Sequence, residues 1–251
     1  ILYISHKLHE VQELCEHATI LRGGRVVGEC NPKVETPRSM AELMIGDKLT
    51  PPERNKPDLT DAPTRLEVSN LSLASDNPFG VDLDKVSFAV KGGEILGVAG
   101  IAGSGQVELM AALAGETIIA DFDDCVRIDG QGVASHGPGK RRRLGAVFVP
   151  EERNGHGAVP GMSLADNAFL TAFRRMNLVK NGLIQSDPTE AFATDIIQSF
   201  DVRTTGHAAE AGSLSGGNLQ KFIVGREVRQ EPGVMAINQP TWGVDAGAAA
   251  A

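Results

Sequence analysis

Two glycine-rich stretches of the sequence have residue types and spacing suited to phosphate binding, one at residues 100–107 and the other at residues 214–221. Each lies where a loop is expected to turn into a helix. At such a helix N-terminus the unpaired backbone N–H groups and the positive end of the helix dipole attract anions. Glycine lets the backbone approach the ligand closely, and Ser215 adds a hydroxyl group. The pattern therefore indicates phosphate binding, although a serine followed by two glycines is also common in plain helix caps and linkers.

The first stretch has the glycine spacing of the phosphate loop G-x-x-x-x-G-K-[ST] but lacks its charged and metal-binding residues. Gln106 stands where a lysine would reach the β- and γ-phosphates, and Val107 stands where a hydroxyl group would hold Mg²⁺. The backbone cradle is kept, so weak nucleotide or phosphate binding stays open while efficient hydrolysis is not expected. The alternative is a strand-to-helix connection that holds no ligand. The residues expected to contact a nucleotide here are Gly100, Gly103, Ser104, Gly105, Gln106 and Val107.

A second loss of catalytic groups follows the apolar run at residues 234–237. A hydrolytic site would carry a metal-binding Asp and a general-base Glu directly after this strand, but the sequence has Asn238 and Gln239. Amides take up no proton at neutral pH, and they are poorer ligands than carboxylates for a hard cation. We therefore expect these amides to line a nucleotide pocket, and we assign no metal ligand to this chain.

The elements that must position these loops alternate between strands and helices. The sequence predicts strands at residues 1–6, 66–71, 86–90, 94–100, 126–130, 144–150 and 234–237, and a hairpin at 19–29. It predicts helices at residues 7–17, 39–45, 108–114, 162–176, with Ser163 as N-cap, and 188–200. Residues 47–64 contain four prolines and no apolar periodicity, which is typical of a linker between domains.

Composition excludes several classes of function. The net charge of −8 argues against a nucleic-acid surface, and the basic run at residues 140–143 is expected to be a solvated loop face. The three cysteines have no metal-ligand spacing and suit reduced thiols in a cytosolic protein. No apolar run approaches the ~20 residues of a membrane span, so any role at a membrane would be peripheral.

The second stretch, Leu-Ser-Gly-Gly-Asn-Leu-Gln-Lys, resembles the signature sequence of ATP-binding cassette (ABC) ATPases, in the form used by importers of simple sugars and nucleosides. Arg226 and the strand at residues 234–237 follow at the spacing of that family. The resemblance covers essentially the whole chain and implies an ATP-hydrolysing subunit that uses ATP and Mg²⁺. It implies that the signature residues contact the nucleotide; these are Leu214, Ser215, Gly216 and Gly217.

The resemblance assigns roles to three further residues. His6 matches the switch histidine, which hydrogen-bonds the γ-phosphate and the attacking water; without the resemblance it would be a structural or solvent-facing residue. Glu151 occupies the glutamine position of the Q-loop, which contacts the metal site and the transmembrane partner; otherwise residues 151–153 would be a solvated acidic turn. Asp245 matches the D-loop aspartate that bridges the two halves of a cassette pair.

The fold implied is an α/β P-loop NTPase of the ABC cassette type, with an antiparallel β subdomain, a mainly parallel core sheet and an inserted α-helical subdomain. Residues 1–46 would be the C-terminal end of a first nucleotide-binding domain, and 65–251 a second one that is truncated at its C-terminal end. In this family two such domains pair head to tail around ATP. This chain would then give one hydrolytic site its switch histidine and its signature loop, while its own phosphate loop lines a degenerate site.

The implied partners are transmembrane permease subunits, an extracytoplasmic substrate-binding protein reached through the permease, and the first nucleotide-binding domain of the same chain. The implied location is peripheral, on the cytoplasmic face of the inner membrane. One alternative is a soluble twin-cassette ATPase that acts on ribosomes or nucleic acid; another is a purely structural remnant. The short Pro-rich linker and the lost lysine favour the transporter.

Overall fold

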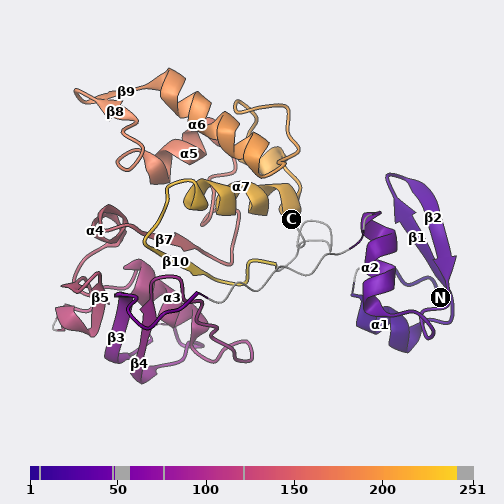
Figure 1. Ribbon diagram of the computed structural model, residues 1–251, viewed down its shortest axis with the longest axis horizontal. Helices are drawn as coiled ribbons and strands as arrows, with labels where there is room; N and C mark the ends of the chain where they lie inside the picture. The colour runs from indigo at the N-terminus through magenta and orange to yellow at the C-terminus, as the bar shows by residue number, and fades with distance from the viewer. Residues whose placement is uncertain (6, 47, 49–56, 76, 121, 242–251) are drawn as a thin grey trace. The chain divides into compact units, whose positions relative to one another are not determined.

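The computed structural model describes residues 1–5, 7–46, 48, 57–75, 77–120 and 122–241. The chain divides into two compact units (Figure 1), the smaller formed by Ile1–Asn55 and Thr241–Ala251 and the larger by Lys56–Pro240. In the described part of the chain, every helix is too short or too polar to cross a lipid bilayer.

The smaller unit is a β-hairpin with two helices. Its elements are α1 (Leu8–Leu14), β1 (Ala18–Arg22), β2 (Arg25–Cys30) and α2 (Pro37–Ile45). The predicted hairpin is confirmed. Its turn is formed by Gly23 and Gly24, which both have positive φ, at 57° and 75°, between antiparallel strands. Helix α2 begins at a capping box between Thr36 and Ser39 and ends at Gly46 in the left-handed conformation. Local turn and cap residues therefore set these elements, as the sequence predicts.

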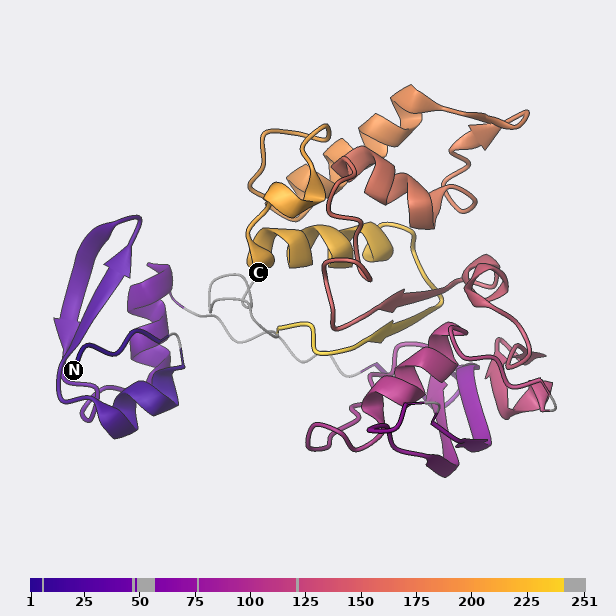
Figure 2. The ribbon, with the colours of Figure 1, turned by 180° about the vertical axis from the view of Figure 1, so that it is seen from behind.

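The larger unit has three layers (Figures 1 and 2). An antiparallel sheet in the order β4-β3-β5-β6 lies on one side of the parallel pair β7–β10, and helices α5, α6 and α7 lie on the other side. In chain order its elements are β3 (Thr64–Leu73), β4 (Leu83–Lys91), α3 (Gln106–Ala114), a 3₁₀ turn (Asp123–Cys125), β5 (Val126–Ile128), β6 (Gln131–Gly132), α4 (Pro138–Arg143), β7 (Ala146–Val149), α5 (Leu164–Ala172), β8 (Val179–Lys180), β9 (Leu183–Ile184), α6 (Ser186–Ser199), a 3₁₀ turn (Ala211–Ser213), α7 (Gly216–Val228) and β10 (Val234–Ile237).

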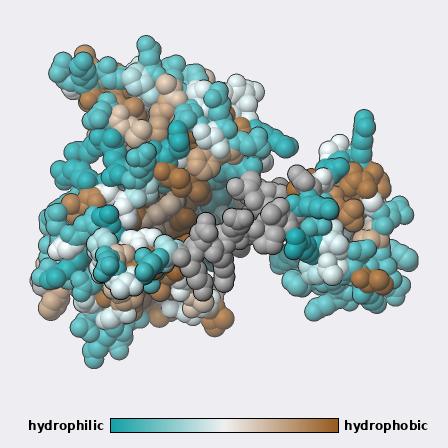
Figure 3. All heavy atoms as spheres, viewed as in Figure 1, coloured by the Kyte–Doolittle hydropathy of each residue, from teal (hydrophilic) through white to brown (hydrophobic). Residues whose placement is uncertain are grey.

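Two apolar cores hold these layers together. The first lies between the antiparallel sheet and α3, where Val68, Val126 and Leu113 pack together. The second lies among α5, α6 and α7, where Ala168, Ile196 and Phe222 are fully buried. In the space-filling view, brown apolar side chains gather near the middle of the larger unit (Figure 3), in the region of α7 and β10. Burial of these helix and strand faces supplies most of the stabilising free energy, at about 25 cal/mol per Å² of apolar surface.

Two predicted strands are not strands in the structure. Residues 94–100 are apolar, yet Ile95 and Val98 are 96% and 59% exposed, and within the described ranges no strand is hydrogen-bonded to them. Residues 1–5 are likewise unpaired, with Ile1, Leu2 and Ile4 exposed. An apolar run favours burial, but a strand also needs a neighbour that accepts and donates its backbone hydrogen bonds. The parallel part of the sheet therefore consists, in the described residues, of β7 and β10.

The basic run at residues 140–143 is a helix, α4, and not the solvated loop face that its charge predicts. Arg141 is fully buried and donates hydrogen bonds to the backbone carbonyls of Ala112, Leu113 and His136. The last carbonyls of a helix lack partners within the helix, so the guanidinium caps the C-terminus of α3. Burial lowers the pKa of Arg141 to about 10. Arg141 of α4 therefore has a structural role, because it holds the end of α3, the helix that follows the phosphate loop.

The contact between α6 and α7 depends on Gly225. A Cβ atom built at Gly225 would lie 2.6–3.0 Å from ring atoms of Phe200, at the end of α6. We expect Gly225→Ala to lower the free energy of unfolding by about 1–3 kcal/mol, because overpacking outweighs the ~1 kcal/mol of helix propensity that alanine adds. Urea denaturation measures the change. Gly139→Ala in α4, where a Cβ would meet nothing within 4 Å, is the matched control and should not destabilise. Equal stability of the two variants would contradict the packing argument.

Candidate functional site

The first glycine-rich loop connects residues 94–99 to α3, as the sequence predicts. Gly103 and Gly105 have φ of 81° and 95°, a left-handed conformation that favours glycine, and Gly105 is the N-cap of α3. Helix α3 therefore begins at Gln106, two residues before the predicted start. Val107 is 64% exposed and brings no metal-binding group to the loop.

The Gln106 side chain folds back over this loop. Its amide nitrogen donates a hydrogen bond to the carbonyl oxygen of Ile101 at 3.0 Å, and its amide oxygen accepts one from the backbone N–H of Ser104 at 3.0 Å. These two partners fix which end of the amide is the oxygen, because a carbonyl only accepts and an N–H only donates. The side chain thus occupies a loop donor that a phosphate would use.

The second glycine-rich loop lies open at the N-terminus of α7. Ser215 is the N-cap, and its Oγ accepts hydrogen bonds from the backbone N–H of Asn218 at 3.5 Å and from the Asn218 side chain at 2.9 Å. Ser215 and Gly216 are exposed, whereas Leu214 and Gly217 are half-buried. The first turn of the helix therefore presents backbone N–H groups and a hydroxyl group to solvent, which suits an anion delivered from outside.

The core behind this loop holds the helix tip in place. Leu219, Phe222 and Ile223 are each at most 1% exposed and lie in the helical core, and Leu214 packs against the same cluster. The N-terminal end of α7 is therefore held by a buried apolar base.

The parallel pairing brings two of the predicted site residues to one edge of the sheet. Asn238 follows β10, Glu151 follows β7 after one residue, and the Asn238 N–H donates to the carbonyl of Val149 at 2.9 Å. Both side chains are half-buried; Gln239 is exposed with φ of 46°. In the described ranges no hydrogen bond or ion pair joins these three residues to the loop at 100–107 or to the loop at 214–217. His6 and Asp245 lie outside the described residues.

A buried ion network, which sequence reasoning missed apart from Arg226, crosses this region. Arg226 donates to Glu227 at 2.9 Å, to the carbonyl of Gly157 at 2.9 Å and to the carbonyl of Asn167 at 3.2 Å. Glu227 also accepts from Arg142 of α4 at 2.7 Å. The sequence did contain a signal for this network, because Arg226 and Glu227 are two successive charged residues on the part of α7 where apolar residues are expected.

Electrostatics keep this network ionised. Burial raises the pKa of the Glu227 carboxyl, but the guanidinium groups of Arg226 and Arg142 outweigh it and hold that pKa below its usual value. Burial in turn lowers the pKa of Arg226, although Glu227 opposes this. The network links the helix of the second loop to the loop at residues 150–159, to α5 and to α4.

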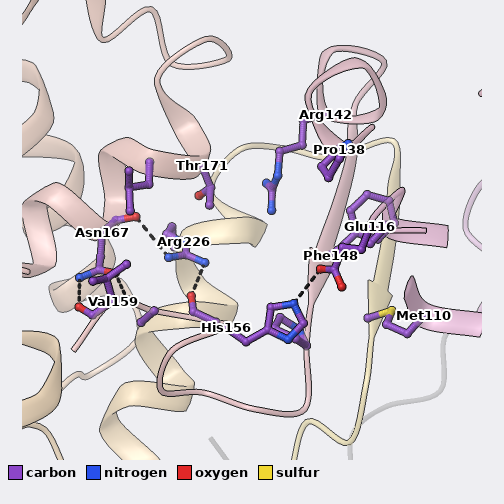
Figure 4. A pocket seen from close by; sticks show the side chains of 15 residues that line it. Met110, Glu116, Pro138, Arg142, Phe148, His156, Val159, Asn167, Thr171 and Arg226 are labelled. Carbon is purple, nitrogen blue, oxygen red and sulfur yellow. Dashed lines mark hydrogen bonds and ion pairs between the residues drawn. The ribbon is translucent and has the colours of Figure 1, made fainter. Parts of the chain in front are cut away.

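Figure 4 shows a cavity of about 140 Å³ beside this network. Its walls come from α3, α4, β7, the loop at 150–159, α5 and α7, and most of the lining is apolar, including Met110, Phe148, Val159 and Leu170. On one side His156 contacts Glu116 at 2.7 Å. The cavity can take an apolar side chain, and its lining includes Pro150 and residues 156–159 of the loop that contains Glu151.

The residues present do not fit a metal-bound nucleotide at this chain's own phosphate loop. Gln106 fills a loop donor, Val107 offers no oxygen, and an amide replaces the carboxylate at Asn238. In the described residues no cluster of three or more His, Cys, Asp or Glu side chains is arranged to hold a metal ion. The open tip of α7, in contrast, fits a phosphate group.

Comparison with known proteins agrees with this geometry. The family model described as "ABC transporter" matches residues 83–242. The protein named "Glucose import ATP-binding protein TsgD13", from Haloferax volcanii, is 34% identical over 252 residues, which are 99% of this chain and 45% of that protein. The chain thus spans about half the length of this relative.

Two solved structures show the same fold. The dimeric ATP-binding cassette MJ0796, solved in a post-hydrolysis state bound to ADP and Pi, gives a TM-score of 0.60 at 18% identity, covering 73% of this chain and 77% of that one. A nucleotide-free ATP-binding cassette from an ABC transporter gives 0.55 at 19% identity, covering 74% and 73%. At these identities the match concerns the fold alone, and it confirms the predicted cassette fold with its antiparallel sheet.

Proposed function

Because this chain belongs to the ABC transporter family, we propose that it is part of an ATP-hydrolysing subunit that energises a membrane importer of simple sugars or nucleosides. The observation that carries the proposal is the exposed tip of α7, where Ser215 and Gly216 present phosphate donors to solvent from a buried base. The name of the 34% identical relative supports import, and favours a sugar as the cargo.

The tip of α7 acts on an ATP molecule held mainly by another domain. In the proposed pairing, Ser215 and Gly217 approach the γ-phosphate from the side opposite the partner's phosphate loop, and His6 orients the attacking water. Asp245 lies at the junction of the two halves. ATP and its Mg²⁺ ion would be bound by the loop of the partner domain, since Gln106 and Val107 replace the lysine and the metal-binding hydroxyl residue here, and Asn238 and Gln239 replace the two carboxylates.

The partner domain is proposed to be the first nucleotide-binding domain of the same polypeptide. Residues 1–46 would be its C-terminal end, 47–64 the linker and 65–251 the second domain. Two observations support this: residues 1–46 and 65–240 fall in different compact units, and a continuous match to one relative spans 99% of the chain but only 45% of that relative.

The permease is proposed to dock at the cavity behind the Glu151 loop. The cavity is mostly apolar and is walled by both the helical layer and the core, so a side chain inserted there would contact both layers at once. Through Arg226 and Gly157 the same loop is bonded to α7. Docking would therefore be transmitted to the signature tip, and the subunit would lie on the cytoplasmic face of the inner membrane, with the extracytoplasmic substrate-binding protein reached through the permease.

Capture experiments test this function. The tagged full-length subunit, purified in mild detergent, is expected to bring down a multi-spanning membrane protein. Leu170→Glu, at the cavity, should reduce that capture at least about tenfold, because a buried interfacial carboxylate costs several kcal/mol. Leu183→Glu, on β9 and outside the cavity lining, is the matched control and should leave capture unchanged. Association with ribosomes instead of a membrane protein would favour the soluble alternative and contradict the proposal.

A further inference from the structure

In the phosphate loop at residues 100–107, a backbone N–H group is already hydrogen-bonded to a side chain of the same loop. Ser104 N–H, which points to the concave side of a nucleotide-binding loop when it binds phosphate, is hydrogen-bonded here by the amide oxygen of Gln106. The amide nitrogen of the same side chain donates a hydrogen bond to the Ile101 carbonyl, so it does not point outward in place of the missing lysine. One side chain thus bridges the two ends of the loop.

The loop backbone is shaped around this side chain. A Cβ atom at Gly100 would lie 2.6 Å from the Gln106 amide nitrogen, so a larger residue there would displace the amide from this position. The left-handed turns at Gly103 and Gly105 bring Ser104 N–H toward Gln106, which is the first residue of α3. Backbone and side chain together form a closed arrangement in which the amide oxygen takes the place of a phosphate oxygen.

We propose that Gln106 is a built-in occupant of this loop, which excludes nucleoside triphosphate from the chain's own pocket until the side chain swings out. This inference rests on the proposed function for the identity of the excluded ligand. The inference explains how the degenerate half of the cassette pair keeps its loop closed without a bound phosphate. The neutral amide of Gln106 takes the place of the phosphate oxygen in the loop.

The proposal and a phosphate-binding role for Gln106 predict opposite changes in ATP affinity when the Gln106 amide is removed. If the amide helped to bind phosphate, its removal would weaken binding. If it occupies the loop, Gln106→Ala frees Ser104 N–H and should tighten binding of ATP to the 251-residue chain by about three- to tenfold, the value of one net hydrogen bond. Titration calorimetry with ATP, and separately with inorganic phosphate, measures the change.

Two further variants complete the test. Gln106→Glu keeps an oxygen that accepts from Ser104 N–H and adds a charge that repels phosphate, so it should bind ATP no better than the original chain. Gln106→Lys should bind ATP more tightly than Gln106→Ala but should not hydrolyse it, since Val107, Asn238 and Gln239 remain. Gln131→Ala, an exposed glutamine of β6, is the matched control and should leave binding unchanged.

Amide exchange provides a readout that does not depend on any ligand. The Ser104 N–H should exchange with solvent faster in Gln106→Ala than in the original chain, while the thermal melting temperature falls by no more than a few degrees. Equal or weaker ATP binding by Gln106→Ala, or no binding at all, would overturn the inference. That result would leave the proposed function intact, since the function depends on Ser215 and not on this loop.

Discussion

Replacing Ser215 by arginine is expected to lower ATP turnover of the full-length subunit about a hundredfold or more. In the proposed pairing, the serine hydroxyl and the N–H groups behind it would meet the charge that develops on the γ-phosphate, and loss of one such donor typically costs about 10²–10³ in rate. An arginine side chain at this exposed N-cap also blocks the close backbone approach that Gly216 permits. Steady-state phosphate release measures the effect.

The same experiment separates a catalytic loss from a folding defect. Ser215 is exposed, so its side chain contributes little to the core, and the variant should keep its melting temperature within a few degrees. Ser199→Arg, an equally exposed serine at the end of α6, is the matched control and should turn over ATP normally. Gly217→Asp should act like Ser215→Arg by repelling the phosphate. Unchanged turnover in Ser215→Arg would contradict the proposed pairing of the two domains.

Replacing Glu227 by glutamine is expected to lower the free energy of unfolding by about 3–5 kcal/mol, because it leaves Arg226 buried without a counter-charge. Arg226 is 3% exposed and Glu227 fully buried, so water cannot take over the lost interaction. Urea denaturation at pH 7 measures the loss. Glu231→Gln, exposed at the end of the same segment, is the matched control and should change stability by less than about 0.5 kcal/mol.

The pH dependence of this difference gives an independent check. The pKa of Glu227 is held below its usual value by Arg226 and Arg142, although burial alone would raise it. Such a group contributes stability above its unfolded pKa of about 4.3, and that contribution is lost as the pH falls through the lower folded value. The gap in stability between the original chain and Glu227→Gln should therefore be full at pH 7 and should shrink below about pH 4. A gap that does not change with pH would show that the effect is steric and not electrostatic.

Local features of the larger unit could be predicted from the sequence because their causes are local. Ser163 caps α5 as predicted, and Ser215 lies at the N-terminus of α7, where the sequence predicts a helix to begin. An N-cap needs only a short polar side chain and the N–H groups that follow it. Helix ends were less accurate: α5 stops at Ala172, four residues before the predicted end. The chain beyond it forms the small β8–β9 hairpin, which was not predicted because each of its strands has only two residues.

Arg141, Glu227 and residues 94–100 could not be predicted correctly because their surroundings come from distant parts of the chain. Charge alone suggests that Arg141 is solvated, but the unsatisfied carbonyls of α3 draw it into the interior. Glu227 is buried because Arg142, 85 positions away, reaches it. Residues 94–100 are apolar enough for a core strand, yet the described chain places no paired strand beside them.

The sequence by itself determined which chemical groups each glycine-rich loop possesses. Residues 214–217 have a serine and backbone N–H groups, whereas the loop at 100–107 has Gln106 in place of the lysine and Val107 in place of the metal-binding hydroxyl residue. Residue identity sets charge, proton affinity and donor count regardless of fold. The tertiary structure alone decided which of those groups are free, leaving Ser215 exposed on a buried helix while Gln106 fills its own loop. Hydrogen bonds and burial depend on neighbours that only the folded chain brings within reach.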